Sequence, residues 1–410
     1  MGIYEELGVK TIISACGPKT TLSGTRMPMR AAQAMAEASQ SFVDMDQLQA
    51  KASEVIAQAT GAEAGLVTSG AAAALTLGTA ACITGLDIVK MQKLPDASQL
   101  KNEVIIPRHH RNVFDHSIRA AGVKLVEVGL FGRSIGVGVR GVEDWEIESA
   151  INERTAAIAF FNKPQVVPSL ESVIKIGKRN GVPVLVDAAG GVPPTIRKLI
   201  EMGADLVAAS GGKMMRGPQA TGILCGRKDL IMAAALQMLD MDTRFETWNP
   251  PPQFIDKSKL PGIPQHGFGR GFKAGKEEIV ALIVAIKTYG TTDHEAETAD
   301  YERRMKRLVE LLSKVEGVKP GYIPVSPVRS LPGVEVRFLN ARSLQDMVEI
   351  VARLKSSDPP VYLYERELEE MTLSVNPFNL TDSDVETIAR SVAKVVEEVP
   401  LPLPESAGPR

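Results

Sequence analysis

Residues 182–213 read VPVLVDAAGGVPPTIRKLIEMGADLVAASGGK, and this stretch decides the fold. Two short apolar runs, at 182–186 and 206–209, flank a segment that has the pattern of an amphipathic helix. Continuous apolar runs are typical of strands that are buried on both faces, as in a parallel sheet that helices cover. The stretch therefore predicts a strand–helix–strand unit of a layered α/β domain.

The same alternation of apolar runs and helical segments extends along most of the chain. Further strands are predicted at 65–68, 104–107, 124–128, 156–161 and 222–225, which gives a mostly parallel, seven-stranded sheet. The predicted organisation begins with an N-terminal arm and helix at residues 1–45 and a large domain at residues 46–275. A long connecting helical block follows at residues 276–315, and a small α+β domain with a Pro-rich tail at residues 316–410.

Composition and charge limit the kinds of partner. The chain has 410 residues with 47 Lys and Arg against 49 Asp and Glu, a formal net charge of −2. This balance gives no support for a nucleic-acid-binding surface or a membrane-adsorbing patch. The cysteines Cys16, Cys82 and Cys225 lie far apart, which excludes a disulfide framework or a cysteine-built zinc site and suits a reducing compartment.

The N-terminus and one uncharged stretch bear on localisation. Residues 1–10 carry acids where a signal peptide needs a basic and then an apolar run. Residues 64–86 have no charge, but Ala, Gly, Ser and Thr dominate them, so they predict a buried strand, a turn and a core helix. We therefore expect a soluble, cytoplasmic protein.

The segment Gly136–Gly141 matches the GxGxxG pattern of dinucleotide-binding loops. Such a loop needs an acid at the end of the following strand, but that strand ends in Asn162. The helix that would follow the loop also brings acids against a pyrophosphate, at Glu143, Asp144 and Glu146. We interpret the segment as a glycine-rich surface loop.

A histidine cluster, His109, His110 and His116, invites a metal-site interpretation. The histidine spacing and the lack of a backing carboxylate or thiolate argue against metal. A histidine that follows a buried strand is better placed for a ligand, because ligands of open α/β folds bind at the carboxyl edge of the sheet.

Three further features fall at the carboxyl ends of predicted strands. The turn Ser69-Gly70-Ala71 opens a helix, whose N-terminus attracts an anion such as phosphate. Asp187 ends an apolar run, where an unpaired carboxylate is costly to bury. Lys213 follows Ser210 and two glycines. Taken singly, each feature has another interpretation. The turn at 69–71 also fits tight helix packing, Asp187 also fits a cap of the next turn, and Lys213 also fits an ordinary surface lysine.

Together, the three features describe a site for pyridoxal phosphate. Lys213 would hold the cofactor as a Schiff base, and Asp187 would keep the pyridine nitrogen protonated so that the ring can accept electrons from a Cα carbanion. The helix N-terminus and the Ser210 hydroxyl would bind the phosphate, and the imidazole of His110 would stack on the ring.

At these residues the chain resembles the aspartate-aminotransferase-like (fold type I) pyridoxal phosphate enzymes. Within that group it is similar to the selenocysteine synthase / D-glucosaminate-6-phosphate ammonia-lyase family. The matching strings are LVTSGAAA at 66–73, VLVDAA at 184–189, SGGK at 210–213, RGPQ at 216–219, GRKDL at 226–230 and GRGFKAGKE at 269–277.

The resemblance implies site residues by position. It implies Lys213 as the Schiff-base lysine, Asp187 as the partner of the pyridine nitrogen, and Asn162 or Gln165 facing the 3-oxygen of the cofactor. It places the phosphate near Ser69, Gly70, Ala71 and Ser210.

The resemblance also implies a homodimer or higher homo-oligomer with a shared active site. The neighbouring subunit would lend residues 266–273, so that Arg270 and Lys273 reach phosphate or substrate. An exposed basic loop is the alternative for this segment. Many relatives grip a substrate carboxylate with an arginine on a late strand, where this chain has Asn376 with Arg366 upstream, so the carboxylate must be held elsewhere or the substrate differs.

The expected activity is that of a lyase on an amino acid or amino sugar acid. Lys213 would remove the Cα proton, a β-substituent such as hydroxide would leave, and hydrolysis would release ammonia. Racemisation, aldol cleavage, transamination and a non-catalytic cofactor-binding role stay open. Selenium transfer on seryl-tRNA is disfavoured, because the family members with that activity carry an additional N-terminal tRNA-binding region that this chain lacks.

Overall fold

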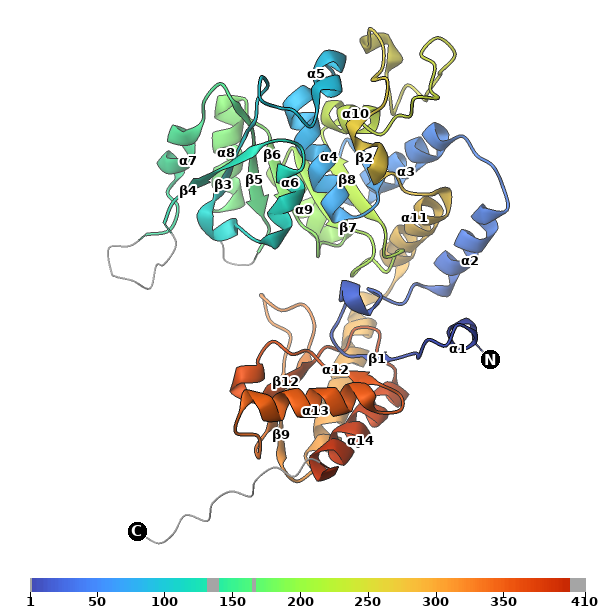
Figure 1. Ribbon diagram of the computed structural model, residues 1–410, viewed down its shortest axis with the longest axis vertical. Helices are drawn as coiled ribbons and strands as arrows, with labels where there is room; N and C mark the ends of the chain where they lie inside the picture. The colour runs from blue at the N-terminus through green and yellow to red at the C-terminus, as the bar shows by residue number, and fades with distance from the viewer. Residues whose placement is uncertain (1, 131–139, 164–166, 399–410) are drawn as a thin grey trace. The chain divides into compact units, whose positions relative to one another are not determined.

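The computed structural model describes residues 2–130, 140–163 and 167–398 (Figure 1). Contacts between Cα atoms divide the chain into two compact units. One unit comprises residues 26–291, and the other joins residues 1–25 to residues 292–410. The four domain boundaries expected from the sequence stay a prediction.

The unit of residues 26–291 contains a seven-stranded sheet. Its strands are β2 (Ala64–Thr68), β3 (Glu103–Pro107), β4 (Lys124–Val128), β5 (Thr155–Phe161), β6 (Val184–Asp187), β7 (Leu206–Ser210) and β8 (Gly222–Gly226). The strand order is β2-β8-β7-β6-β5-β3-β4, and β8 runs antiparallel to both of its neighbours while the other pairs are parallel. This arrangement confirms the predicted fold class.

Helices cover both faces of this sheet (Figure 1). The helices of this unit are α2 (Met29–Ser39), α3 (Met45–Thr60), α4 (Ala71–Thr84), α5 (Ile88–Lys93), α6 (His116–Arg119), α7 (Asp144–Ala150), α8 (Leu170–Asn180), α9 (Pro193–Met202), α10 (Lys228–Leu236) and α11 (Lys276–Thr291), of which α2 packs on α11. Alternate strand residues enter opposite cores: Leu185 and Leu206 pack with α4 and α10, whereas Val186 and Val207 pack with α8 and α9.

Helix α4 lies at the centre of one face and is buried on nearly all sides. Its Ala-rich sequence fits this position, because small side chains let the helix approach the sheet. At Gly78 a Cβ atom would lie 3.1–3.5 Å from the δ-methyl carbons of Leu185, Leu224 and Leu206. The uncharged stretch 64–86 is therefore a strand and a core helix, as predicted, and none of the helices in the described part of the chain is long and apolar enough to cross a bilayer.

Helix α3 covers the outer edge of β2, the edge strand of the sheet. The buried amide of Gln49 donates to the carbonyl of Val67 at 2.9 Å and accepts the N–H of Val67 at 3.1 Å. The Ser53 hydroxyl accepts the N–H of Gly65 at 2.9 Å. These side chains take the place of another strand and leave this part of the edge paired.

The second unit has an α+β fold. Strands β9 (Val318–Ile323), β10 (Gly333–Phe338) and β12 (Thr372–Val375) form an antiparallel sheet, with helices α12 (His294–Leu312), α13 (Leu344–Ser356) and α14 (Asp382–Glu398). The short helix α1 is Ile3–Glu6, and β1 (Ile13–Ser14) pairs in parallel with β11 (Val361–Tyr362). The N-terminal segment thus adds a strand to the C-terminal unit.

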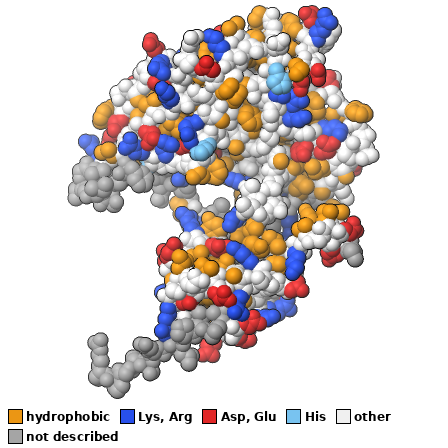
Figure 2. Space-filling model, viewed as in Figure 1, with side chains coloured by type: hydrophobic (Ala, Val, Ile, Leu, Met, Phe, Trp, Pro, Cys, Tyr) orange, Lys and Arg blue, Asp and Glu red, His pale blue; other side chains and the backbone are white. Residues whose placement is uncertain are grey.

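The surface carries charges of both signs. On the face that Figure 2 shows, Lys and Arg side chains are interspersed with Asp and Glu side chains. Mixed charge of this kind keeps a protein soluble without building a strong field of one sign.

Candidate active site

The carboxyl ends of β2, β7, β6, β5 and β3 lie at one edge of the large sheet, because these strands run in the same direction. Most of the predicted site residues follow these ends: Ser69, Gly70 and Ala71 after β2, Ser210 and Lys213 at β7, Asp187 at β6, Asn162 after β5 and His110 after β3. The antiparallel strand β8 begins at the same edge with Gly222.

A glycine brings two parts of the site together. Gly222 pairs with Ser210 on one side and with Thr68 on the other. A Cβ atom at residue 222 would lie 2.2 Å from the carbonyl carbon of Gly70, so only glycine permits this approach. Gly70 itself has φ of +129°, a conformation that L side chains rarely adopt.

The turn after β2 leaves the N-terminus of α4 open. Gly70 is the N-cap residue, and no described side chain caps this helix. The N–H of Ser69 is used within the fold, since it donates to the carbonyl of Phe272 at 3.0 Å. The N–H groups of the first turn of α4, beginning with Ala71, therefore form a cradle suited to an anion.

Asp187 is the buried acid of the site. The residue is 7% exposed, and its carboxylate accepts the N–H of Ala189 at 3.1 Å. Burial raises the pKa of the Asp187 carboxyl, whereas the Ala189 hydrogen bond and the positive charge of Lys213 act in the opposite direction. The positive charge of Lys213 thus favours the charged form of this carboxyl and lowers its pKa, although no ion pair joins the two side chains within the described residues.

Lys213 lies half-buried in a tight loop between β7 and β8. The loop is closed by backbone hydrogen bonds from Gly211 to Thr221 at 2.9 Å and from Gly217 to Gly211 at 2.8 Å. The carbonyl of Lys213 accepts the N–H of Arg216, which has φ of +55°. The backbone of Lys213 is thus held in a fixed loop at the carboxyl end of β7.

His110 is fully buried at the end of β3. Its Nδ1 atom accepts the N–H of Phe161 at 3.2 Å, and its ring packs edge-to-face on Phe160 with 4.6 Å between ring centroids. Burial lowers the pKa of His110 to about 3, and the charges of His109 and Lys163 add to this effect. His110 and Asp187 line the same small cavity of about 10 Å³, which has room for about one water molecule.

Of the two residues expected to face the 3-oxygen of the cofactor, the structure describes Asn162. The N–H of Asn162 donates to the carbonyl of Asp187 at 2.9 Å, which places Asn162 beside the acid. Gln165 lies outside the described residues, as do Gly136 and Gly138. The acids that follow the GxGxxG segment begin α7, where the Glu143 N–H donates to the Glu146 carboxylate at 2.8 Å.

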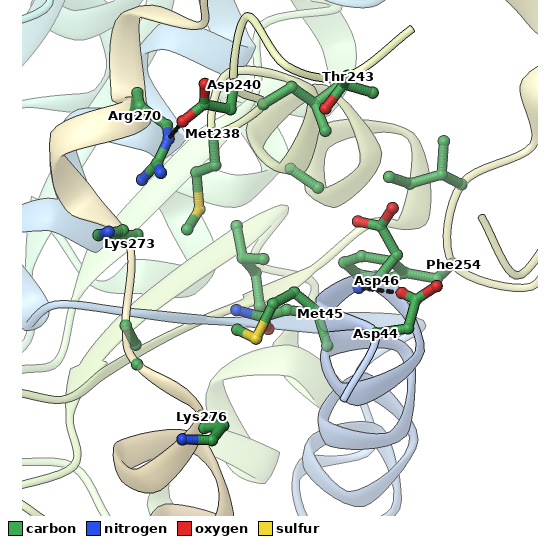
Figure 3. A pocket seen from close by; sticks show the side chains of 17 residues that line it. Asp44, Met45, Asp46, Met238, Asp240, Thr243, Phe254, Arg270, Lys273 and Lys276 are labelled. Atoms are coloured by element: carbon green, nitrogen blue, oxygen red, sulfur yellow. Dashed lines mark hydrogen bonds and ion pairs between the residues drawn. The ribbon is translucent and has the colours of Figure 1, made fainter. Parts of the chain in front are cut away.

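Arg270 and Lys273 lie elsewhere on the same unit. They line a cavity of about 480 Å³, together with residues from α3, α10 and the start of α11 (Figure 3). Arg270 forms an ion pair with Asp240 and Lys273 is exposed. Asp187, Lys213 and His110 do not line this cavity, although the carbonyl of Phe272, next to Lys273, accepts the N–H of Ser69 in the turn before α4.

Sequence reasoning missed this larger cavity. Figure 3 shows Arg270, Lys273 and Lys276 on one side and Asp44 and Asp46 on the other. The Asp46 carboxylate accepts the Trp248 indole N–H at 2.5 Å. The two residues are 202 positions apart in the sequence, so no local sequence pattern predicts this contact. Burial raises the pKa of the Asp46 carboxyl, with the hydrogen bond from Trp248 opposing the rise.

The donor set fits pyridoxal phosphate. A buried carboxylate suits the pyridine nitrogen, a neighbouring amine suits the aldehyde, and an open helix N-terminus in a cradle that a Cβ would fill suits the phosphate. Within the described ranges, no group of three or more His, Cys, Asp and Glu side chains is placed to hold a metal ion.

Asn376 belongs to the other unit, where it follows β12. Its N–H donates to the carbonyl of Ala15 at 2.8 Å, and its side-chain oxygen accepts the N–H of Phe378 at 2.9 Å. The side chain is engaged as a turn cap, and Arg366 upstream is exposed.

Comparison with known proteins gives consistent relatives. The 5'-C-glycyluridine monooxygenase-decarboxylase of a Streptomyces species is 29% identical over 402 residues, which cover 96% of this chain and 92% of that protein. The D-glucosaminate-6-phosphate ammonia lyase of Salmonella typhimurium is 28% identical over 404 residues, which cover 96% and 98%. A solved structure of D-glucosaminate-6-phosphate ammonia-lyase superposes with a TM-score of 0.79 at 27% identity, covering 97% of this chain and 98% of that one.

A family model decides the assignment. The model described as aminotransferase class-V matches residues 133–348, more than half of the chain. This range contains the acid at the end of β6 and the lysine after β7. The resemblance found in the sequence is thereby confirmed, and the chain belongs to the aminotransferase class-V family of pyridoxal-phosphate-dependent enzymes.

Proposed function

We propose that the protein is a pyridoxal-phosphate-dependent ammonia-lyase that acts on an amino acid or amino sugar acid. The observation that carries the proposal is a buried carboxylate, Asp187, at the carboxyl edge of the sheet, with Lys213 at the next strand end and near enough for its charge to lower the pKa of that carboxyl. The near full-length similarity to D-glucosaminate-6-phosphate ammonia lyase supports this choice of reaction.

The residues divide the chemical tasks. When bound, pyridoxal phosphate supplies an electron sink for negative charge at the substrate Cα. Lys213 would hold the cofactor through its aldehyde and, once the substrate amine had displaced it, would accept the Cα proton at Nζ. Asp187 would supply negative charge for the pyridine nitrogen, and the first turn of α4 and the Ser210 hydroxyl would hold the phosphate. Loss of the β-hydroxyl as water, then hydrolysis of the released enamine, yields one keto acid and one ammonia per substrate.

The proposed assembly is a homodimer or higher homo-oligomer in the cytoplasm. Arg270 and Lys273 line a cavity apart from the Asp187 edge of their own chain, which agrees with a role toward the site of a neighbouring subunit. In that role, the two cations would contact the phosphate or the substrate carboxylate. With Asn376 engaged as a turn cap, these cations are also the proposed substitute for a late-strand arginine.

The test uses the purified protein loaded with pyridoxal phosphate. We expect absorbance near ~420 nm, and release of ammonia and keto acid in equal amounts from D-glucosaminate 6-phosphate or from a panel of D- and L-hydroxy amino acids. Lys213→Ala should abolish both the absorbance and the activity, whereas the exposed Lys175→Ala should retain both. Unchanged absorbance in Lys213→Ala would refute the assignment. Racemised, cleaved or transaminated products would identify one of the other Cα reactions.

A second candidate is oxidative decarboxylation. It is favoured by the similarity to 5'-C-glycyluridine monooxygenase-decarboxylase, at 29% identity over 402 residues. Consumption of oxygen and release of carbon dioxide without ammonia would identify this reaction in the same substrate panel.

A further inference from the structure

The connection between α2 and α3 carries exposed apolar side chains. Phe42 is fully exposed, and Val43 and Met45 are exposed beside it. The connection is nevertheless held in place, because the Asp44 carboxylate caps α3 and accepts the N–H of Asp46 at 2.9 Å. Three large apolar side chains within four consecutive residues, on a connection with a fixed shape, are typical of a surface that binds another protein.

The same connection borders the cavity of about 480 Å³, which Asp44 and Met45 line. Buried apolar residues form part of the cavity wall, among them Leu66, Leu239 and Phe254. Cavities of this volume accommodate small molecules, so a phenyl ring fits as well. An exposed aromatic side chain and a cavity with apolar walls thus lie next to each other on one face of the unit.

The charged residues at the cavity are separated by sign. Asp44 and Asp46 lie on one side, and Arg270, Lys273 and Lys276 lie on the other (Figure 3). Within the part of the chain that the structure describes, Asp44, Asp46 and Lys273 form no ion pair. Burial raises the pKa of the Asp46 carboxyl, and the negative charge of Asp44 adds to this effect. A cation contributed by another molecule would therefore be favourable beside the two acids.

We infer that two copies of the chain associate through this face, with Phe42 of each copy seated in the cavity of the other. A two-fold axis sets a surface against its own copy, so such a surface must be complementary to itself. Here the rotation brings Phe42 to the apolar wall and the two acids to the basic side of the other copy. Because acids and bases balance on this face, a second copy fits it better than a strongly charged partner does.

The inference rests on the proposed function for the homo-oligomer, and it adds the residues through which the copies meet. It places Arg270 and Lys273 at the contact between the copies, where the proposed shared site requires them.

The first measurement is the association of the protein loaded with pyridoxal phosphate, by analytical ultracentrifugation over a range of concentrations. Phe42→Asp places a charge in each of two identical contacts, so we expect the dissociation constant of the dimer to rise at least about a hundredfold. Trp145→Asp is the matched control, because this exposed aromatic residue lies on α7, which packs on β4 at the opposite edge of the sheet from β2. Equal dissociation constants for the two variants would overturn the inference.

The second measurement locates the contact. The photo-crosslinking residue p-benzoylphenylalanine replaces Phe42, and unlabelled copies are mixed with ¹⁵N-labelled copies so that crosslinks between chains are recognised by mass. We expect crosslinks between chains that join position 42 to cavity-lining residues at 238–240, 254–255 or 273–276. The same residue at position 145 should give no crosslink between chains. Crosslinks from position 42 only within one chain, or to another part of the second copy, would show that the face is assigned wrongly.

Ammonia release in the same samples separates two failures. A parent protein that stays monomeric yet releases ammonia would refute this contact and leave the lyase reaction standing. A dimer with the expected crosslinks that releases no ammonia from any substrate would refute the reaction and leave the contact standing.

Discussion

At the scale of single residues, the charge of Asp187 links cofactor binding to stability. Its pKa is raised by burial, so the folded chain without cofactor holds the proton more tightly than the unfolded chain does. This proton contributes stability below the ordinary aspartate pKa, and the contribution is lost as pH rises through the folded value. At neutral pH the negative charge of the buried Asp187 carboxylate therefore destabilises the cofactor-free fold. A protonated pyridine nitrogen beside the carboxylate would offset this cost.

Asp187→Asn should separate stability from binding. At about pH 7 the cofactor-free variant is expected to be at least as stable as the parent, and this advantage should vanish as pH falls below the folded pKa of Asp187. Affinity for pyridoxal phosphate should fall at least about tenfold, because the charge partner of the pyridine nitrogen is gone. Urea unfolding at two pH values and cofactor titration measure both effects, with the exposed Asp242→Asn as control. A variant that is less stable at neutral pH would contradict the assigned pKa direction.

At the scale of elements, apolar runs predicted all seven strands of the large sheet, because strands buried on both faces leave a continuous apolar signal. The sequence did not predict β9, whose Pro320 and Gly321 read as a turn, or the two-residue strand β1. The antiparallel direction of β8 is set by the tight loop around Lys213 and by the pairing of Gly222, neither of which leaves a periodic signal.

The candidate site was predictable for a related reason. Asp187, Ser210 and His110 each follow a buried strand, so the position of the strand end places the residue. The partner of Val67 was not predictable, because Gln49 on α3 looks like any polar helix residue until the sheet edge is known.

Gln49→Ala tests how α3 protects the sheet edge. The substitution leaves the buried N–H and C=O of Val67 without partners, and we expect a loss of about 1–3 kcal/mol in the free energy of unfolding. Gln47→Ala, on the exposed side of the same helix, should change stability by less than about 0.5 kcal/mol. Urea unfolding measures both, and equal values for the two variants would show that the side-chain pairing does not stabilise the edge.

Gly222→Ala tests the contact between β8 and the turn before α4. The added Cβ would lie 2.2 Å from the Gly70 carbonyl carbon, so the turn must move. We expect a loss of about 1–3 kcal/mol in stability together with weaker binding of pyridoxal phosphate. Gly262→Ala is the control, since its Cβ would meet no atom within 4 Å. Tight cofactor binding in Gly222→Ala would show that the cradle does not hold the phosphate.

At the scale of the whole molecule, the N-terminal segment belongs with the C-terminal unit. Ile13 is 6% exposed and pairs with Val361, and the carbonyl of Ala15 accepts the N–H of Asn376. Residues 3–6 have no buried side chain. The segment 13–15 is therefore expected to stabilise the unit of residues 292–398.

Truncation separates these two parts of the N-terminus. Removal of residues 2–16 should raise hydrogen exchange around β10, β11 and β12, while the sheet of residues 26–291 keeps its protection. Removal of residues 2–9 alone should leave both units protected, because it deletes no buried side chain. Loss of protection in the large sheet, with β10 and β12 unaffected, would contradict the assignment of this segment.

The pairing of β1 with β11 also imposes an order on biosynthesis. Cys16, which follows β1, and its carbonyl partner Tyr362 are 346 positions apart in the sequence. Translation of the residues between them takes roughly 20–70 seconds, and the two segments can pair only after that time. During that interval every strand of the large sheet has already left the exit tunnel. The strand that is synthesised first is thus among the last to pair, and its Ile13 side chain stays accessible to chaperones until then.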